Sequence, residues 1–456
     1  MILVVGAGVT GLAAAFELTR RGLPVTLVEA SGRAGGLIVT ERVGGFVIDG
    51  GPDALLAQKP AAVQLCEDLG LGDRLMSTLP PRTAFVLKHG RLHPLPSPSV
   101  LGIPTTLRAV RRYDLLSWRG RARLALEPVV PRREPGDESV ASFFRRRFGE
   151  ETVGLVAEPL LAGIHAGDVE ALSVASLFPR LVEAEQQPGK VLRTLGARTP
   201  PRGQGLFRAL RGGMGELVDA LLARLPEGTL QLATCVEGLQ AAAGGWRAAA
   251  LDRSFDAGAV ILAVPAHVVA LLLAAIDPRA GELCAGVPYV STASVALGWR
   301  REDVRHPLAG SGFVVARACT ELRMTACTWV SSKWAHRAPE GHVLLRAFLG
   351  GAHDPSVVEL PDEALAGVAI REIQATLGIT APPMLSRVYR TRRGGAQHHV
   401  GHGARMAELM TRLQSRPGLF AAGSGFEAVG IPDCIEHGRR AAAAAAAYVG
   451  ARDRSS

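Results

Sequence analysis

The sequence predicts a mixed α/β fold that is divided into several structural units. A chain of 456 residues corresponds to about two to four domains of ordinary size. Its hydrophobic fraction is 48% and its charged fraction 20%, which supports a large buried core and excludes a disordered or fibrous protein. Apolar runs of β-forming residues alternate with helical patterns and glycine-rich turns, and this order is typical of an α/β protein.

The first forty residues carry the clearest pattern. A run of β-forming residues, Ile2–Val5, leads directly into a glycine turn that ends at Gly11. A helical pattern over residues 12–21 follows, and a second β run, Val25–Val28, ends at Glu29. Strand, glycine turn, helix, strand and acid in this order predict a dinucleotide-binding βαβ unit.

Each glycine of the turn has a physical role in such a unit. Gly6 allows the tight turn, Gly8 lets the backbone approach a pyrophosphate, and Gly11 permits close packing of helix and strand. The helix N-terminus offers free N–H groups and a positive dipole to the phosphates. Glu29 can accept hydrogen bonds from both ribose hydroxyls of an adenosine, and it disfavours NADP because an acid would repel a 2′-phosphate.

The residues after Glu29 distinguish FAD from NAD. Arg33, Gly35 and Gly36 complete an E-x-x-x-R-x-G-G string. This string resembles the extension found in the flavoprotein superfamily of amine oxidases, carotenoid desaturases and porphyrinogen oxidases. A second glycine turn would let the backbone pass close to an extended FAD; the alternative is a glycine-rich surface turn.

Later segments are expected to return to the first sheet. Short β runs near residues 230–236, 246–251 and 260–264 continue the α/β pattern, and the C-terminal part contains a strand, a glycine turn and a long helix through the alanine run 441–447. The uncharged stretch 257–276 is long enough to cross a membrane, but Pro265 and a change of composition within it favour a buried strand followed by a helix.

The net charge of +9 is concentrated in one part of the chain. Eleven arginines and five acids lie between Ser97 and Arg147. This segment could attract carboxylated molecules, dock a partner enzyme, touch an anionic membrane or be a solvated face with arginine-rich coding. A nucleic-acid patch is not supported, because the segment has few interleaved aromatic residues and no recognised nucleic-acid fold accompanies it.

Over nearly its whole length the chain resembles the oxygen-dependent porphyrinogen oxidases of haem synthesis. Within that family it looks most like the bacterial branch that oxidises coproporphyrinogen III, with the protoporphyrinogen IX oxidases as the alternative. The motifs that carry the resemblance are Gly51-Pro52-Asp53, Gly102-Ile103-Pro104-Thr105, 142–147, 158–168, Leu172-Ser173, Phe178-Pro179, Gly401-His402 and 429–435.

The resemblance implies three domains. A discontinuous, Rossmann-like FAD-binding domain is expected over 1–56, 204–276 and 410–456. A mixed-sheet substrate-binding domain is expected over 57–96, 176–203 and 277–409. Residues 97–175 are expected to form an α-helical insert, which touches the bilayer in membrane-associated relatives.

It also implies the reaction and the cofactor contacts. A porphyrinogen would lose six electrons in three flavin cycles, with hydride passing to flavin N5 and then to O2 as H2O2. No catalytic acid or base is named. The FAD contacts carried over are Gly6, Gly8, Gly11, Glu29, Arg33, Gly35, Gly36, Gly51, Pro52, Val236, Val429, Gly430 and Ile431.

Substrate contacts follow less directly from the resemblance. Relatives hold a substrate propionate with a basic side chain shortly after the Gly-Pro motif, and Lys59 is the matching residue; the alternative is a solvated lysine at a helix start. Three positions depart from the family pattern, namely Thr391, His398 and Ser424. They lie near flavin or substrate in relatives, so affinity or substrate preference is expected to differ.

Other functions are weighed and set aside. His398, His399 and His402 lack a Cys or acid to complete a metal site, so no metal is expected. Six scattered cysteines without a C-x-x-C motif favour a reducing cytoplasm, with peripheral contact to a membrane left open. An amine oxidase or desaturase, and a binding protein on the same fold, remain distant alternatives.

Overall fold

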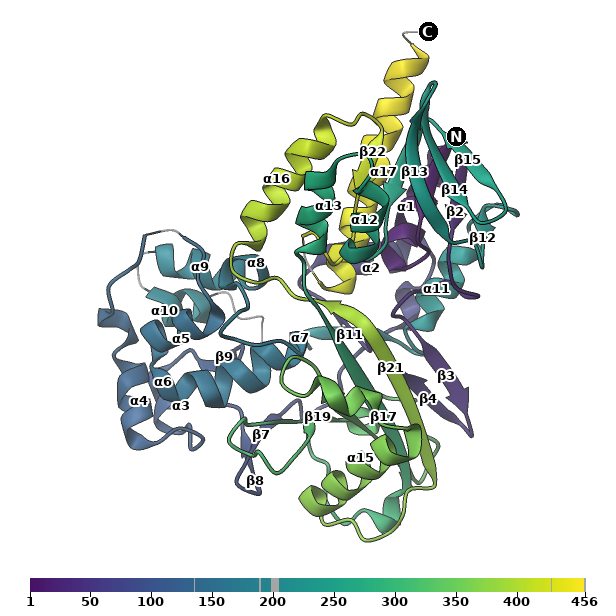
Figure 1. Cartoon of the computed structure of the whole chain (residues 1–456). Coiled ribbons are helices and arrows are strands. Elements are labelled where there is room, and N and C mark those ends of the chain that lie inside the picture. Colours follow the sequence, from purple (N-terminus) through teal and green to yellow (C-terminus); the bar gives the residue numbers. More distant parts are fainter. Residues whose placement is uncertain (135, 188–189, 198–204, 428, 455–456) are drawn as a thin grey trace.

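The computed structural model describes residues 1–134, 136–187, 190–197, 205–427 and 429–454. Figure 1 shows three bodies, which we call the parallel-sheet body (top), the helical body (left) and the mixed-sheet body (bottom). The predicted mixed α/β class is confirmed. The predicted domain limits stay predictions, and the limit between 203 and 204 lies outside the described residues.

The parallel-sheet body is built on five parallel strands from three distant parts of the chain. Their order is β12-β2-β1-β16-β22. The expected return of later segments to the first sheet is confirmed for β12, β16 and β22, but it is wrong for the run 246–251, which forms part of a separate antiparallel sheet. The bounds are β1 (Ile2–Val5), β2 (Val25–Val28), β12 (Leu230–Gln231), β16 (Ala259–Leu262) and β22 (Leu419–Ala421).

Both faces of this sheet are covered, which explains why β1 is apolar at every position. Ile2 and Val4 pack among helices on one face, while Leu3 and Val5 pack on the other. The first face carries α1 (Val9–Arg20), α2 (Pro60–Asp68), α11 (Gly215–Leu222) and α17 (Ile431–Asp453). The second carries α12 (Ala266–Leu273), α13 (Pro278–Ala285), α16 (His402–Gln414) and a meander of β13 (Val236–Ala242), β14 (Gly245–Ala250) and β15 (Ser254–Ala257).

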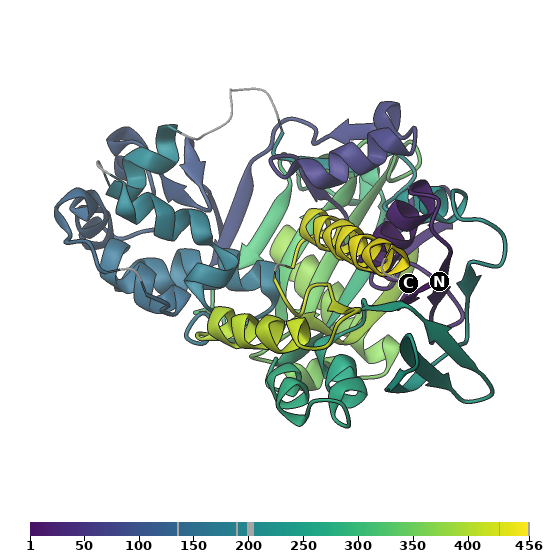
Figure 2. The same ribbon diagram turned by 90° about the horizontal axis from the view of Figure 1, so that it is seen from above.

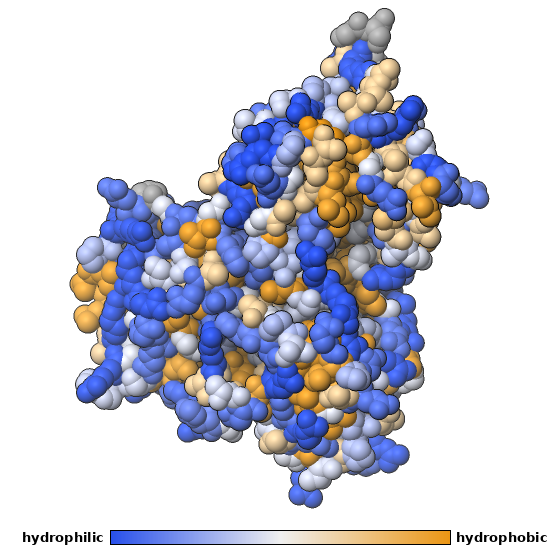
Figure 3. Space-filling view, in the orientation of Figure 1, coloured by the Kyte–Doolittle hydropathy of each residue, from blue (hydrophilic) through white to orange (hydrophobic). Residues whose placement is uncertain are grey.

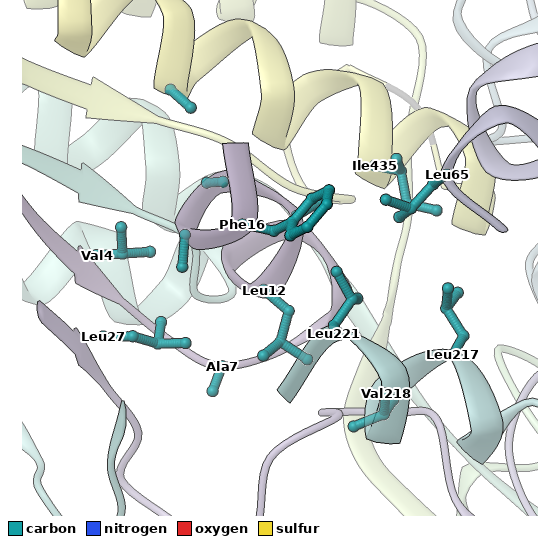
Figure 4. Packing of buried hydrophobic residues seen from close by; sticks show 14 of the residues in the cluster. Val4, Ala7, Leu12, Phe16, Leu27, Leu65, Leu217, Val218, Leu221 and Ile435 are labelled. Atoms are coloured by element: carbon teal, nitrogen blue, oxygen red, sulfur yellow. The ribbon is translucent and has the colours of Figure 1, made fainter. Parts of the chain in front are cut away.

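Helices α1 and α17 lie side by side although they come from opposite ends of the chain (Figure 2). Figure 4 shows the side chain of Phe16 between them, close to Ile435 and Leu65. Phe16 is 6% exposed, and burying a side chain of this size contributes about 1.5–3 kcal/mol. The two ends of the chain are thus joined in one core.

The mixed-sheet body contains seven strands in the order β21-β17-β20-β19-β18-β7-β8. One face packs against α15 (Asp362–Leu377). The other face carries Ser294 and Arg346, which reach the loop at Gly50 and Gly51. The strands are β7 (Ala84–Lys88), β8 (Arg91–Pro94), β17 (Tyr289–Arg300), β18 (Gly312–Val315), β19 (Met324–Trp329), β20 (His342–Gly350) and β21 (Leu385–Ala396).

The helical body packs around its own core, in which Phe143, Phe144 and Phe148 are fully buried. Inside this core Arg147 forms an ion pair with Glu127, and neither side chain is exposed. The helices are α3 (Leu107–Arg111), α4 (Trp118–Ala125), α5 (Val140–Phe148), α6 (Glu150–Thr152), the π-helix η3 (Val153–Ala162), α7 (Gly163–His165), α8 (Val174–Leu177), α9 (Pro179–Gln186) and α10 (Lys190–Ala197).

Short elements connect the three bodies. They are β3 (Thr40–Val43) with β4 (Phe46–Asp49), β5 (Leu55–Leu56) with β11 (Phe207–Leu210) and β6 (Leu75–Ser77), β9 (Ser99–Val100) with β10 (Ile103–Pro104), α14 (Val330–Lys333), and the 3-10 turns η1 (Gly72–Arg74), η2 (Glu127–Val129), η4 (Arg301–Asp303) and η5 (Pro355–Glu359).

Two sequence expectations about membranes and charge can be compared with this fold. The stretch 257–276 contains strand β16 and helix α12, as predicted. Within the described residues, no helix combines the length and the apolar character that a bilayer crossing requires. The positive charge of 97–147 is partly neutralised by acids beyond that segment, because Arg145 pairs with Glu170 at 2.7 Å and Arg146 with Glu185 at 2.6 Å.

Candidate functional site

The first glycine turn closes the carboxyl end of β1 and leaves no room for side chains. Gly6 has a φ of +100°, and a Cβ there would lie 2.6 Å from the carbonyl oxygen of Ala263. A Cβ at Gly11 would lie 1.8 Å from the carbonyl oxygen of Gly6. α1 begins after Gly8, which has no side chain to cover the first N–H groups of the helix. The turn therefore has the shape of a phosphate-binding site.

The second glycine turn is packed against the first. Gly35 N donates a hydrogen bond to Ala7 O at 2.8 Å, and a Cβ at Gly36 would lie 3.0 Å from the Cα of Gly8. The Arg33 guanidinium donates to Gly36 O at 2.6 Å, so it braces the loop from its own side. The two turns form one continuous backbone cradle at the end of the sheet.

Glu29 is fixed across the mouth of the first turn. One of its carboxylate oxygens, Oε2, accepts from Ala7 N at 2.8 Å, while the other, Oε1, accepts from Ser31 N at 2.9 Å. Thr234 N donates to Glu29 O at 2.8 Å, which brings the start of β13 at Val236 to the same edge of the sheet. The structure thus brings Glu29 and Val236, two of the expected FAD contacts, to one edge of the sheet.

The Gly51-Pro52 loop lies on the second glycine turn. A Cβ at Gly51 would be 1.8 Å from the carbonyl oxygen of Leu37, so only glycine fits. The buried Arg346 donates to Gly51 O at 2.7 Å, and Ser294 Oγ donates to Gly50 O at 3.1 Å. The mixed-sheet body therefore holds this loop from behind through two residues that sequence reasoning missed.

A charged pair follows the same loop. Lys333 Nζ lies 3.0 Å from Asp53 Oδ2, and Trp334 Nε1 donates to the same oxygen at 3.3 Å. Burial by itself raises the pKa of Asp53, but the charges of Lys333 and Arg346 outweigh it and hold this pKa well below its usual range. Asp53 is ionised at neutral pH, and its charge balances the cations behind the loop.

The N-terminus of α17 forms another side of the candidate site. Val429 and Gly430 precede the helix, which begins at Ile431. Asp433 in its first turn accepts from Lys59 Nζ at 2.5 Å through Oδ1 and at 2.7 Å through Oδ2. Lys59 therefore lies next to residues for which flavin contacts are predicted, although its charge is compensated by Asp433.

Two of the departures from the family pattern are in contact. His398 Nε2 donates to Ser424 O at 2.8 Å. The ring of His398 stacks on that of His402 with centroids 3.8 Å apart, and His402 Nε2 donates to Phe426 O at 3.1 Å. Burial, aided by the neighbouring His398, lowers the pKa of His402 to about 4. These histidines hold the C-terminal glycine turn, and the third departure, Thr391, is paired with Thr292 on the mixed sheet.

One group with metal-ligand spacing occurs among the described residues. Ligand atoms of Glu158, Asp168 and His353 lie within 4.8 Å of one another. The guanidinium of Arg317 already lies 3.1 Å from Glu158 Oε1, where it supplies the positive charge that a cation would bring. His398 and His402 are not part of this group.

Some of these residues could have been found from sequence. Asp433 lies within the motif 429–435, one turn from the predicted flavin contacts, so its place at the site had a local signal, whereas its pairing with Lys59 had none. Arg346 and Ser294 lie within long β runs, and nothing in their neighbours distinguishes them from other strand residues.

The residues present fit FAD. The glycine cradle would hold the phosphates, Glu29 the ribose, and the loop at Gly51 together with the start of α17 the ring system. Gly8 has only the Cα of Gly36 within 4.0 Å of where a Cβ would stand, so the cradle is not filled by the protein itself. A backbone cradle with an acid at its end suits an extended dinucleotide.

Comparisons with known proteins agree with this site. The family model for flavin containing amine oxidoreductases matches residues 9–446. A coproporphyrinogen III oxidase of Bacillus subtilis (strain 168) is 37% identical over 98% of this chain and 98% of its own length. A protoporphyrinogen oxidase of Bos taurus is 31% identical over 97% of each chain.

A solved structure is also similar over the full length. A protein from Exiguobacterium sp. 255-15, provisionally named a protoporphyrinogen oxidase, superposes with a TM-score of 0.87 at 32% identity and covers 97% of both chains. Sequence, fold and glycine cradle lead to the same assignment. The chain belongs to the flavin containing amine oxidoreductase family and binds FAD.

Proposed function

We propose that this protein oxidises coproporphyrinogen III to coproporphyrin III, with O2 as the final electron acceptor. The macrocycle loses six hydrogens, so three two-electron steps produce three molecules of H2O2. The observation that carries the proposal is the 37% identity to a coproporphyrinogen III oxidase over 98% of both chains, together with an intact FAD cradle.

The residues of this chain would bind and orient the reactants. Bound FAD supplies the acceptor for the hydride that the porphyrinogen loses. The N–H groups at the start of α17, behind Gly430 and Ile431, would stabilise negative charge on the ring system. Arg346 and Ser294 would keep the Gly50-Gly51 loop in place, and no side chain of this chain is assigned as a catalytic acid or base.

An aerobic assay with both porphyrinogens tests the substrate. We expect porphyrin fluorescence to rise faster with coproporphyrinogen III than with protoporphyrinogen IX, because the first has four carboxylates and the second two. Anaerobic bleaching of the flavin by each porphyrinogen would show that electrons reach FAD. A clear preference for protoporphyrinogen IX would replace our proposal by the alternative that the Bos taurus relative suggests.

Two more distant functions make different predictions. Turnover of amines or polyenes, without activity on either porphyrinogen, would indicate an amine oxidase or a desaturase. A purified protein that takes up no FAD would indicate a binding protein on the same fold. The complete glycine cradle argues against the latter.

We further propose that the helical body makes peripheral contact with an anionic membrane surface. Leu107, Trp118, Leu126 and Val129 are each more than half exposed. Figure 3 shows apolar residues at the outer edge of this body, among hydrophilic ones. Exposed apolar side chains near arginines are typical of a surface that inserts shallowly between anionic headgroups.

Sedimentation with vesicles checks this contact. We expect the protein to bind phosphatidylglycerol vesicles and not phosphatidylcholine vesicles, and to be released by salt because the attraction is electrostatic. Replacing Arg108, Arg111 and Arg112 together by Gln should reduce binding by at least about tenfold, because each arginine close to an anionic surface contributes up to about 1 kcal/mol. Equal binding to both vesicle types would contradict the proposal.

A further inference from the structure

Three charged side chains lie behind the Gly51-Pro52 loop, and we call them the charge cluster. Lys333 ends α14, and its Nζ lies 3.0 Å from Asp53 Oδ2. Asp53 directly follows Pro52, for which a flavin contact is expected. Arg346 of β20 belongs to the same cluster, because it donates to Gly51 O at 2.7 Å. The charge cluster is therefore fixed at the edge of the expected flavin site.

The charge cluster is largely shielded from water. The side chain of Lys333 is 14% exposed and that of Asp53 24%, while Arg346 is 6% exposed. The Lys333 ammonium also lies over the rings of Trp334 and Phe207, 5.1 and 5.6 Å from their centroids. Partly buried charges are screened less by water and salt than exposed ones, so they act over longer distances.

One net positive charge remains in the charge cluster. Burial by itself would raise the pKa of Asp53, but the charges of Lys333 and Arg346 hold this pKa well below its usual range. The cluster therefore contains two cations and one anion at neutral pH. Asp49 lies nearby, but it pairs with Arg337 at 3.1 Å, so these two charges offset each other.

A positive charge beside the flavin ring favours its reduction. Uptake of two electrons and one proton leaves one negative charge on the ring system of FAD. A nearby cation stabilises this reduced form more than the oxidised form and raises the reduction potential, whereas an anion lowers it. Lys333 and Asp53, although they form one ion pair, are therefore expected to act on the potential in opposite directions.

We propose that the charge cluster tunes the reduction potential of bound FAD, with Lys333 raising the potential and Asp53 lowering it. Both are positioning residues, because they act through the loop and through their charge and have no assigned contact with the substrate. The net positive charge would help FAD to accept the hydride. The potential is a property of the bound cofactor, so this role goes beyond the proposed function and holds whichever porphyrinogen is oxidised.

Titration of the FAD-loaded protein against a reference dye of known potential tests this role. At neutral pH we expect Lys333→Met to lower the ratio of reduced to oxidised FAD about tenfold at a fixed potential, which equals a shift of about 30 mV for a two-electron couple. Asp53→Asn should raise that ratio by roughly the same factor. The amide keeps an acceptor for Lys333 and Trp334 but loses the negative charge.

A double variant and a control accompany the single variants. Lys333→Met combined with Asp53→Asn removes one charge of each sign, so its ratio should return to within about twofold of the wild type. Lys88→Met is the matched control, because Lys88 ends β7 and its Nζ donates to Leu115 O of the helical body at 3.3 Å. The control should have the potential of the wild type.

The signs of the shifts separate a charge effect from a structural one. A disturbed loop would move the potential in the same direction in both single variants, and that result, or an unchanged potential in either of them, overturns the proposal. If Lys333→Met does not retain FAD, the direction of the shift in Asp53→Asn decides; loss of FAD from both variants overturns the proposal as well. The aerobic assay of the wild type with both porphyrinogens decides the proposed function independently of these potentials.

Discussion

A Gly11→Val protein is expected to purify without flavin. A Cβ at position 11 would lie 1.8 Å from the carbonyl oxygen of Gly6, which is a backbone atom and not the end of a flexible side chain. Relief of this overlap must separate α1 from the glycine turn, which displaces the N–H groups that would hold the phosphates. Even a cost of about 1.4 kcal/mol lowers FAD affinity tenfold, and this overlap should cost more.

The measurement is the ratio of flavin absorbance to protein in the purified variant, followed by titration with FAD. Gly450→Ala is the matched control, since Gly450 lies in α17 of the same body and a Cβ there meets nothing within 4 Å. The control should retain FAD. Full flavin content in Gly11→Val would show that the first glycine turn does not hold the cofactor.

The second large effect concerns the ion pair inside the helical body. Arg147→Met should destabilise the protein by about 3–5 kcal/mol, because it leaves the carboxylate of Glu127 buried without its partner. Glu127 also accepts from the backbone N–H of Val191 at 3.2 Å, so it cannot turn to solvent without breaking that contact with α10. The midpoint of urea denaturation measures the loss.

Two comparisons separate pairing from packing. Replacing both partners, Arg147→Met with Glu127→Met, should recover most of the lost stability, since a buried pair replaced by apolar residues is often neutral. Arg145→Met removes two exposed ion pairs of the same helix, with Glu150 and Glu170, and should cost about 1 kcal/mol. An unchanged urea midpoint in the single variant Arg147→Met would contradict a stabilising role of this buried pair.

Local sequence patterns were sufficient to predict the strands and the helix that flank the first glycine turn. The predicted runs 2–5 and 25–28 are strands with these bounds, and the helical pattern 12–21 corresponds to α1 over Val9–Arg20. Such segments are readable because a buried parallel strand must be apolar at each position and a glycine turn needs residues without Cβ. The helix begins three residues early because Val9 directly follows the turn at Gly8.

The sequence predicted the candidate site less well where a residue acts through a partner that lies far away along the chain. Lys59 matched a family position, but its compensation by Asp433 depends on α17, which lies more than 370 residues later. Arg346 reaches Gly51 across 295 positions. The sequence overstated the uncompensated positive charge of residues 97–147. Glu170 and Glu185 lie outside that segment and pair with its arginines only in the folded chain.

By itself the sequence determined the class of fold, the glycine cradle with Glu29, and the likeness to porphyrinogen oxidases, because backbone geometry and nucleotide chemistry demand particular residues at short, regular spacing. Only the tertiary structure decided which charges are compensated: Lys59 by Asp433, and Arg147 by Glu127. The physical reason is that an ion pair depends on distance in space, and the spacing of residues along the chain does not determine that distance.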